Sequence, residues 1–170
     1  PVVDNWLGLF SNNYEMNSLV GPGASFESAV NFSFNKNLGI SYFKSILYAL
    51  SNLIDFPIFP NAHIRSSSFM ISARDYQTIE LSKKYKYKKK GTWINESGRR
   101  SMTNQLKKKK FKIFVINSDG SKFKQSSWAL SNTYALGSQS KLIISDKHSR
   151  LYDKSTENEK KIISKRVWGN

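Results

Sequence analysis

Closely spaced lysines and arginines are the residues of this chain whose type and spacing could do chemistry, and that chemistry is the neutralisation of anions. Residues 81–124 contain fifteen lysines and arginines and two acidic residues, whereas residues 1–80 contain four and six. An excess of this size destabilises a compact chain by self-repulsion unless a polyanion neutralises it. The sequence therefore predicts a polyanionic partner whose contacts begin near Lys83.

Aromatic residues are interleaved with these charges, which favours a nucleic acid as the polyanion. Tyr85, Tyr87, Trp93, Phe111 and Phe123 lie among the lysines; aromatic rings stack on bases, while ammonium groups neutralise phosphates. A single lysine run is often a solvated face or a localisation signal, but here the runs recur from residue 83 to residue 124. Lysine outnumbers arginine, so we expect contacts to backbone phosphates more than base recognition.

The predicted RNA-binding residues are basic and lie in these runs and in the C-terminal part of the chain. They are Lys83, Lys84, Lys86, Lys88, Lys89, Lys90, Arg99, Arg100, Lys107, Lys108, Lys109, Lys110, Lys112, Lys122, Lys124, Lys141, Lys147, Arg150 and Lys154.

Residues that could support catalysis or hold a cofactor do not form a recognisable pattern. His63 and His148 are far apart in the sequence, and neither lies in a motif typical of metal ligands. Gly21, Pro22 and Gly23 lack the spacing of a phosphate-binding loop, so we expect a turn there. Asp55 and Asp146 have no evident catalytic partner. We therefore expect no enzyme activity, no cofactor and no metal.

Length and composition set limits on the architecture. A chain of 170 residues with a net charge of +15 can form one domain with a core, or a small domain with a long extension. Because it contains no cysteine, it can form neither a disulfide nor a cysteine-bound zinc site. The longest apolar segment is interrupted by Lys44, Asp55 and Pro57, so we expect no membrane span. No basic residue precedes Lys36, so we expect neither a secretory signal nor an intact transit peptide at this end.

The lysines at 112, 122 and 124 need a β-hairpin to position them. Residues 111–116 are rich in strand formers, Asp119-Gly120 is typical of a tight turn, and residues 121–125 are the predicted return strand. Because the side chains of a strand alternate, these lysines are predicted to share one face while apolar residues pack on the other. Residues 141–145 are predicted to add a third strand.

Other elements are predicted on both sides of the hairpin. Thr156 and Glu159 form a capping box that predicts a terminal helix. Residues 30–34 alternate as in a strand, and residues 68–73 are a second possible strand, followed by a possible short helix through Tyr76, Ile79 and Leu81. A helix is predicted between Phe43 and Ile54, because Phe43, Ile46, Leu47, Leu50, Leu53 and Ile54 recur every three or four residues. This apolar stripe would pack in a core or dock on a neighbouring protein.

These elements predict an α+β protein with three segments. Residues 1–82 would form an N-terminal extension that docks on protein, and residues 106–170 an RNA-binding module with a three-stranded hairpin sheet and a terminal helix. Residues 83–105 would be a basic arm, because such dense like charge should keep it extended until a partner binds.

Two stretches of the C-terminal segment resemble a known family. Residues 114–128, FVINSDGSKFKQSSW, and residues 134–154, YALGSQSKLIISDKHSRLYDK, are similar to segments of the bacterial-type large-subunit ribosomal protein L-thirty-one. The residues that carry the second match are Tyr134, Gly137, Lys141, Asp146, Arg150, Tyr152 and Lys154. Zinc-binding members have cysteines near the glycine turn, where this chain has Asn117, Ser118 and Asp119, so the resemblance implies a zinc-free form.

The resemblance implies a structural constituent of the large ribosomal subunit, bound to rRNA on the central protuberance near the intersubunit bridge. A long extension is common in mitochondrial relatives, so it also implies a place in the ribosome of the mitochondrial matrix, with neighbouring ribosomal proteins as partners and no membrane contact.

Two alternatives stay open. One is a free nucleic-acid-binding or packaging protein. The other is a degenerate homing endonuclease, because residues 50–56, LSNLIDF, are faintly similar to the LAGLIDADG helix, in which an aspartate like Asp55 would hold a metal.

Overall fold

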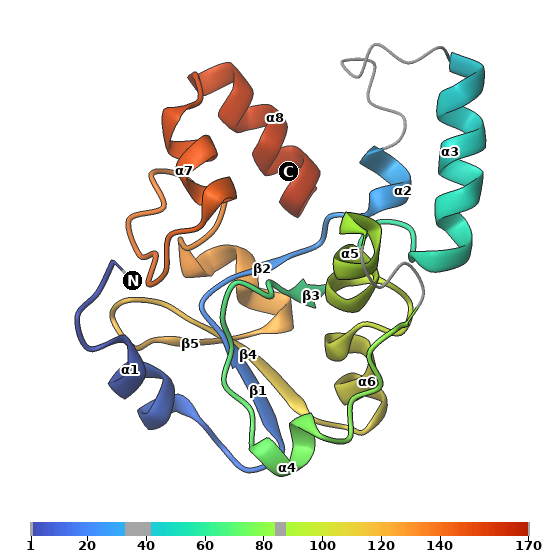
Figure 1. Ribbon diagram of the computed structural model, residues 1–170. Coiled ribbons are helices and arrows are strands. Elements are labelled where there is room, and N and C mark those ends of the chain that lie inside the picture. Colours follow the sequence, from blue (N-terminus) through green and yellow to red (C-terminus); the bar gives the residue numbers. More distant parts are fainter. Residues whose placement is uncertain (1, 33–41, 84–87, 170) are drawn as a thin grey trace.

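The fold belongs to the α+β class, as predicted, with helices packed on both faces of a small mixed sheet (Figure 1). The computed structural model describes residues 2–32, 42–83 and 88–169, and only the backbone of residues 32, 42, 43 and 45. The main sheet has the strand order β1-β4-β5, with β1 Ser18–Gly21, β4 Lys112–Ile116 and β5 Lys122–Lys124. A second, two-stranded sheet pairs β2 Ala24–Ser25 with β3 His63–Ile64.

The predicted hairpin is confirmed. Strands β4 and β5 are antiparallel, with Phe114 opposite Lys124 and Ile116 opposite Lys122. The turn between them has Gly120 at a φ of 76°, a left-handed conformation that glycine adopts without strain. The Asn117 side-chain oxygen accepts hydrogen bonds from the backbone N–H groups of Asp119 and Ser121 at 3.1 and 3.0 Å, which holds the turn.

The prediction of a third strand at residues 141–145 is wrong, because that segment is a loop in which only Ile143 is buried. Its backbone bonds to three separate places: Lys141 to Asn132 and Ser118, and Ile143 to Val2. The third strand is instead β1, which pairs in parallel with β4. The N-terminal segment thus shares one sheet with the hairpin.

Both faces of the sheet are covered. On one face, Leu19, Ile113 and Val115 pack with Leu106 and Trp128, which come from the helix α6 Met102–Lys108 and the 3₁₀ helix η2 Gln125–Ser131. On the other face, Val20, Phe114 and Ile116 pack with Phe10 and Ile143; Phe10 comes from α1 Trp6–Asn13. Burial on both faces explains the continuous apolar run of β4.

The predicted amphipathic helix is present as α3 Tyr42–Asp55, but a different face of it is buried. Ala49, Asn52 and, just beyond the helix, Phe56 are buried, and Phe56 packs with Val30. The side chains of Leu47, Leu50 and Ile54 are 51, 55 and 72 % exposed. Of the predicted stripe, Leu53 packs against the cluster around Phe56, whereas Leu47, Leu50 and Ile54 face away from the core. The side chain of Phe43 lies outside the described residues.

Two predicted strands in the N-terminal segment are corrected. Residues 29–32 form the short helix α2 Ala29–Phe32, and residues 33 and 34 lie outside the described part. In residues 68–73, Met70 bridges Val20 in an isolated antiparallel pair, with backbone hydrogen bonds of 2.8 and 3.0 Å. The predicted short helix is α4 Ala73–Tyr76, which begins at the capping residue Ser72 and ends before Ile79.

The basic arm is not extended where the structure describes it. Residues 89–97 form the helix α5 Lys89–Ser97, and α6 follows after a short link. Ile94 and Trp93 pack with Phe56, and Lys90 pairs with Asp55 at 3.1 Å. Apolar and ionic contacts within the chain thus outweigh the charge repulsion on which the prediction was based.

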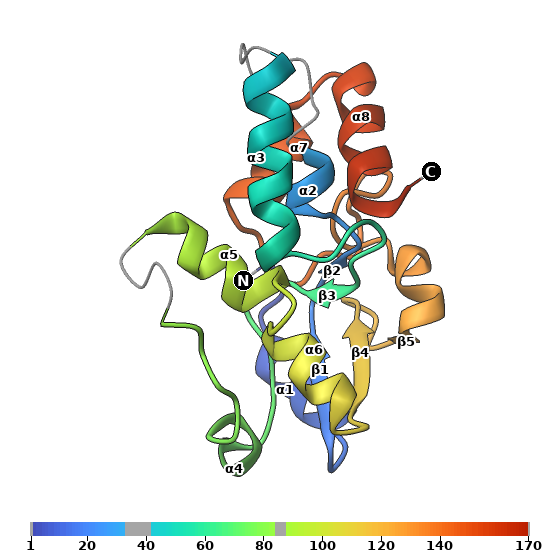
Figure 2. The ribbon, with the colours of Figure 1, turned by 90° about the vertical axis from the view of Figure 1, so that its right-hand side faces the viewer.

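The C-terminal helices are α7 Lys147–Lys154 and α8 Glu157–Trp168. The predicted capping box of Thr156 and Glu159 is confirmed at the start of α8, whereas α7 was not predicted. The indole of Trp168 donates to the Tyr134 carbonyl oxygen at 3.0 Å, which fixes the end of α8 to the core. In two perpendicular views, α3, α7 and α8 lie at the opposite end of the molecule from α1 and α4 (Figures 1 and 2).

Candidate nucleic-acid interface

Lysines from three elements meet around a hollow of about 630 Å³ beside the main sheet. Lys107 lies near the end of α6, Lys112 begins β4, and Lys122 and Lys124 belong to β5. The remaining lining residues are Glu15, Phe111, Ile113, Phe114 and Gln125. Four of the predicted RNA-binding residues therefore come together in one place, which we call the lysine hollow.

The register of the sheet explains why these lysines meet. Lys124 lies opposite Phe114, and Lys122 lies opposite Ile116; residues that face each other across a ladder project from the same side. Lys112 shares that side with Phe114 because side chains repeat every two residues along a strand. The three lysines share a face, as predicted, but the face also carries apolar residues on which α1 packs.

Glu15 lies between two of these lysines, and the sequence interpretation did not include it. Its Oε1 atom is 2.6 Å from Lys122 Nζ, and its Oε2 atom is 2.9 Å from Lys112 Nζ. Hydrogen bonds from Lys122 and Lys112 lower the pKa of Glu15 to about 2. The Lys122 ammonium also lies 4.8 Å from the centre of the Phe114 ring. Glu15 is therefore ionised at neutral pH and balances part of the hollow's positive charge.

Lys107 has mainly a structural role in the free protein. Its Nζ donates to the Ala62 carbonyl oxygen at 2.9 Å and lies 5.7 Å from the Trp128 ring centre. Burial lowers its pKa. Lys124 lines the hollow and is exposed. Lys108 and Lys110 are exposed as well and are next in sequence to the lining residues Lys107 and Phe111. The ion pairs found among the described residues involve none of these three, so their ammonium groups are available to phosphates.

Several other predicted binding residues are engaged within the chain. Lys90 pairs with Asp55, Arg100 pairs with Glu80, and Lys141 pairs with Asp119. Arg99 donates from Nε and Nη2 to the Leu53 carbonyl oxygen at 3.1 and 2.9 Å, and Lys109 donates to Thr78. The Lys90–Asp55 pair is largely buried, with side chains 22 and 9 % exposed. The other contacts are more exposed and exchange readily with solvent and salt, so they do not prevent binding to a polyanion.

The remaining members of the predicted basic arm do not join the lysine hollow. Lys83 shares a separate hollow of about 490 Å³ with Arg99, Arg100 and the acidic residues Asp55 and Glu80. Lys88 and Lys89 are exposed at the start of α5, where Lys89 Nζ lies 5.1 Å from the Trp93 ring centre. Lys84 and Lys86, like Tyr85 and Tyr87, lie outside the described residues.

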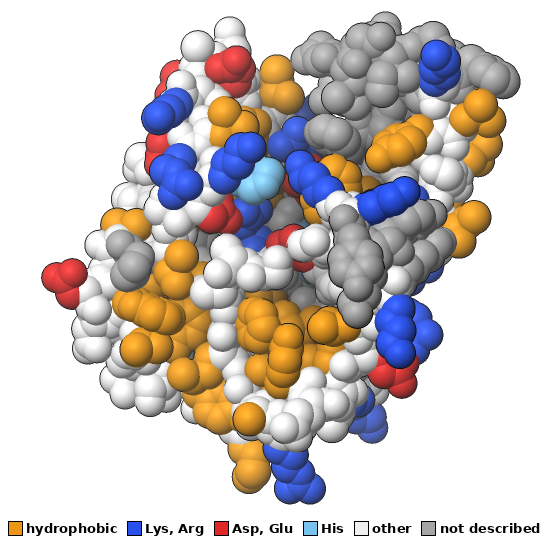
Figure 3. Space-filling view, viewed as in Figure 1, with side chains coloured by type: hydrophobic (Ala, Val, Ile, Leu, Met, Phe, Trp, Pro, Cys, Tyr) orange, Lys and Arg blue, Asp and Glu red, His pale blue; other side chains and the backbone are white. Residues whose placement is uncertain are grey.

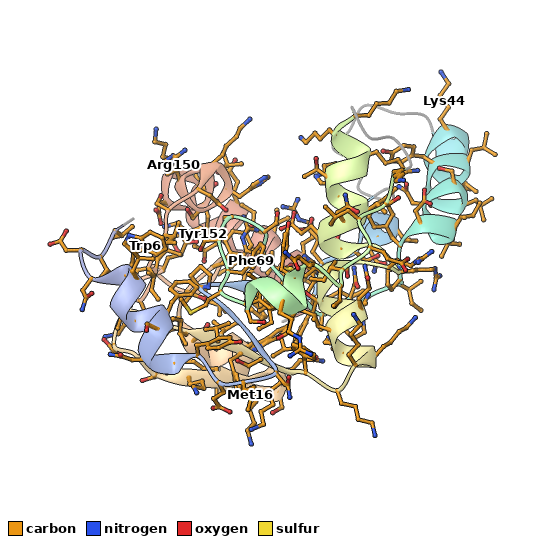
Figure 4. The ribbon with its side chains drawn as sticks, turned by 60° about the horizontal axis from the view of Figure 1, so that its bottom comes forward. Trp6, Met16, Lys44, Phe69, Arg150 and Tyr152 are labelled. Atoms are coloured by element: carbon orange, nitrogen blue, oxygen red, sulfur yellow. The ribbon has the colours of Figure 1, made fainter. Side chains whose placement is uncertain are left out.

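A second basic surface lies on α7. Lys147, Arg150 and Lys154 are spaced three and four residues apart and are all exposed, so they form a stripe along the helix. Figure 4 shows Arg150 pointing away from the body of the molecule. Lys161 and Lys165 of α8 are exposed as well and were not among the predicted residues. Their regular spacing in a predicted helix is a signal that could have identified them.

Asp146 and His63, two of the titratable groups singled out in the sequence, make contacts within the chain. Arg65 Nη2 lies 2.5 Å from Asp146 Oδ2, and its guanidinium stacks 3.6 Å from the Tyr134 ring centre. Despite the opposing effect of burial, the Arg65 charge and its hydrogen bond lower the pKa of Asp146, which also caps α7. His63 is buried with Nδ1 2.7 Å from the Asn61 carbonyl oxygen, and burial lowers its pKa.

Residues 2–32, 42–83 and 88–169 contain neither a cluster of metal-ligating side chains nor a helix that could span a membrane. No three histidine, aspartate or glutamate side chains there are grouped so that they could hold a metal ion. Asp55, the aspartate of the LAGLIDADG-like segment, ends α3 and pairs with Lys90. None of the helices in residues 2–32, 42–83 and 88–169 has the length and apolar character needed to cross a membrane.

Two apolar surfaces accompany the basic ones. One is the exposed α3 stripe of Leu47, Leu50 and Ile54. The other is a hollow of about 460 Å³ between α1 and α4, lined by Trp6, Leu7, Phe10, Phe69, Met70, Ile71, Ala73 and Tyr76. Figure 3 shows apolar side chains gathered over α1 and α4, and Figure 4 shows Trp6 and Phe69 in this region. Contiguous exposed apolar patches are typical of surfaces that contact other macromolecules.

Comparison of the chain with protein-family models, with curated proteins and with solved structures finds no match. The resemblance to the L-thirty-one family therefore depends on the sequence motifs. Of the residues that carry it, Tyr134 and Tyr152 are buried, and Asp146 caps α7. The side chains of Lys141, Asp146, Arg150 and Lys154 are at least partly accessible.

Proposed function

We propose that the protein is a non-catalytic RNA-binding constituent of a ribonucleoprotein, and that this particle is the large subunit of the mitochondrial ribosome. The observation that carries the RNA-binding part is the lysine hollow, in which Lys107, Lys112, Lys122 and Lys124 converge from separate elements. The ribosomal part depends on the resemblance of residues 114–128 and 134–154 to the L-thirty-one family.

A polynucleotide suits this surface better than a small anion does. The exposed Lys108 and Lys110 adjoin in sequence the hollow-lining residues Lys107 and Phe111, so successive phosphates of one strand could each meet an ammonium group. Phe111 lines the hollow and is partly accessible, which allows a base or ribose to pack against it. The cations are mainly lysines, and no arginine lines the hollow, which favours recognition of the backbone over bidentate reading of bases.

The α7 stripe would extend the contact to a second RNA segment. Lys147, Arg150 and Lys154 occupy one exposed helical face, and folded rRNA presents several phosphate backbones to a protein at once. The exposed apolar α3 stripe would meet a neighbouring ribosomal protein, because apolar side chains gain little from contact with phosphates. The charge difference between residues 1–80 and 81–124 fits this division of partners.

Salt-dependent RNA binding tests the first part of the proposal. The full chain is titrated with a fluorescein-labelled 20-nucleotide single-stranded RNA by anisotropy at several KCl concentrations. The logarithm of the affinity should fall with the logarithm of the salt concentration, by about 0.7 per phosphate contacted. The variant K108Q/K110Q/K124Q should reduce that slope by about 2. The variant K147Q/R150Q/K154Q, which loses the same charge, shows how much the α7 stripe contributes.

Fractionation tests the ribosomal part. Mitochondrial lysate in high salt is sedimented, and the protein should be found with the large subunit. The triple variant L47S/L50S/I54S should keep its RNA affinity, because it leaves the lysines intact, but should be incorporated less. Strong RNA binding combined with recovery in the free pool would favour a packaging protein. Metal-dependent DNA cleavage that is lost in D55A would favour the endonuclease.

A further inference from the structure

The Glu15 carboxylate occupies the position between two lysines that an RNA phosphate would take. Each of its oxygens contacts a different ammonium, Lys122 Nζ at 2.6 Å and Lys112 Nζ at 2.9 Å. A phosphodiester likewise presents two negatively charged oxygens to its surroundings. Lysine binds either anion as a compact point charge, without the directional fork of arginine.

The backbone of Glu15 is held independently of its side chain. The Ser18 hydroxyl donates to the Glu15 carbonyl oxygen at 2.6 Å and accepts from the Glu15 N–H at 3.1 Å. Ser18 is fully buried, and the N–H of Lys112 donates to the neighbouring Asn17 carbonyl oxygen at 3.0 Å. The carboxylate can therefore leave the two lysines by side-chain rotation while β1 stays paired with β4.

The three charged side chains are accessible to solvent. The side chain of Glu15 is 39 % exposed, that of Lys112 65 % and that of Lys122 25 %. Exposed ion pairs contribute little to stability because water and salt compete with them. An incoming anion can therefore replace Glu15 without a large loss of folding free energy.

We propose that Lys112 and Lys122 form a phosphate site for the RNA backbone and that Glu15 is its internal occupant, which the RNA displaces. This inference rests on the proposed RNA-binding function. The displaced carboxylate stays close to the bound phosphate and repels it, so the site selects a strand that gains further contacts at Lys108, Lys110 and Lys124. A single free phosphate or a mononucleotide gains no such contacts and does not displace Glu15.

Removing the charge of Glu15 should therefore strengthen RNA binding. Repulsion between two unit charges about 5 Å apart at a wet surface changes a binding constant by roughly four- to fifteenfold. The variant E15Q should bind the 20-nucleotide RNA tighter by that factor in 50 mM KCl. Its salt dependence should be steeper by about 0.7, because one more positive charge is left to be neutralised by phosphate.

The matched control is E157Q. Glu157 pairs with Lys160 at 2.9 Å on α8, so this variant also removes one negative charge and releases one lysine. An equal gain in RNA affinity in E157Q would mean that net charge alone explains the effect, and would refute the proposed phosphate site at Lys112 and Lys122. In a K112Q/K122Q background, E15Q should give less than about a twofold gain, because the proposed phosphate ligands are absent. A full gain in that background would also overturn the inference.

A second measurement uses the wild-type chain, so it does not depend on the folding of a variant. The carboxyl ¹³C resonance of Glu15 should shift on saturation with the RNA at pH 7 and should stay in place with inorganic phosphate. An unchanged resonance at saturating RNA would overturn the inference while leaving the proposed function intact. If the wild-type chain binds no RNA at all, the proposed function itself fails.

Discussion

Residues 106–170 should not fold without the N-terminal segment, although they contain the hairpin and the terminal helix. The reason is that β1 supplies Leu19 and Val20 to the clusters on opposite faces of the sheet, and Phe10 of α1 packs on one of these faces. These three residues are 0, 0 and 2 % exposed. Complete burial of such a side chain contributes about 1.5–3 kcal/mol, so removing all three costs about 5–9 kcal/mol. A whole domain is stable by only about 5–15 kcal/mol.

The assay compares the full chain with a fragment of residues 106–170 by circular dichroism and by ¹H–¹⁵N NMR. The fragment should show poorly dispersed amide signals and no cooperative thermal transition. A dispersed spectrum with a cooperative transition would refute the reasoning and would support an independent C-terminal module.

Single substitutions in the full chain also test whether β1 contributes to the core. Leu19→Ala should lower the free energy of unfolding by about 2–5 kcal/mol, because it leaves a cavity against Ile113 and Val115. Leu130→Ala is the control, since that leucine is 71 % exposed and its loss should change stability by less than about 0.5 kcal/mol. Equal effects in urea titrations would contradict the assignment of β1 to the core.

Three further outcomes follow from the structure. Lys122 and Lys112 lower the pKa of Glu15 from 4.5 to about 2, so this pKa should rise in Lys122→Gln when it is measured by ¹³C NMR; an unchanged pKa would contradict the ion pair. Because the folded-state pKa is depressed, the stabilisation from Glu15 is present above pH 4.5 and is lost as the pH falls toward 2. Thr156→Ala removes the cap of α8 and should cost about 1 kcal/mol in urea unfolding. Asp146→Asn keeps a capping side chain but removes the carboxylate partner of Arg65, whose side chain is only 12 % exposed, and should cost about 3–5 kcal/mol in urea unfolding. A loss below about 1 kcal/mol would show that the pair is well solvated.

Local signals predicted the elements that depend on local chemistry. The Asp119-Gly120 pair and the flanking strand formers predicted the hairpin, and Thr156 with Glu159 predicted the start of α8. The spacing of the apolar residues predicted α3 but not its buried face. Apolar periodicity indicates that a helix can bury a stripe; whether the stripe is covered depends on which neighbours the chain brings to it.

Contacts between distant segments could not be predicted from these patterns. The strand β1 is four residues long, is buried throughout and pairs with a strand more than ninety positions away, so it shows no alternation to detect. Residues 141–145, KLIIS, have the composition of a strand, and Ile143 is buried as in a strand. Their backbone nevertheless forms a loop. The dense positive charge of residues 83–105 predicts an extended chain, whereas in the structure the packing of Ile94 with Val30 and Phe56 stabilises α5.

The same limit applies to the candidate site. The lysines of the hairpin were expected on one face because strand alternation is local, whereas Glu15 reaches Lys112 and Lys122 across sequence separations of 97 and 107 residues. Its role becomes visible only when β1 is placed beside β4.

The measurement that tests the central claim most directly is ultraviolet crosslinking of the protein to RNA within mitochondrial large ribosomal subunits, followed by mass spectrometry of the adducts. The account predicts RNA adducts on peptides that contain Phe111, Lys112, Lys122 or Lys124, with further adducts on α7. Purified large subunits that contain the protein but yield RNA adducts on neither region would contradict it.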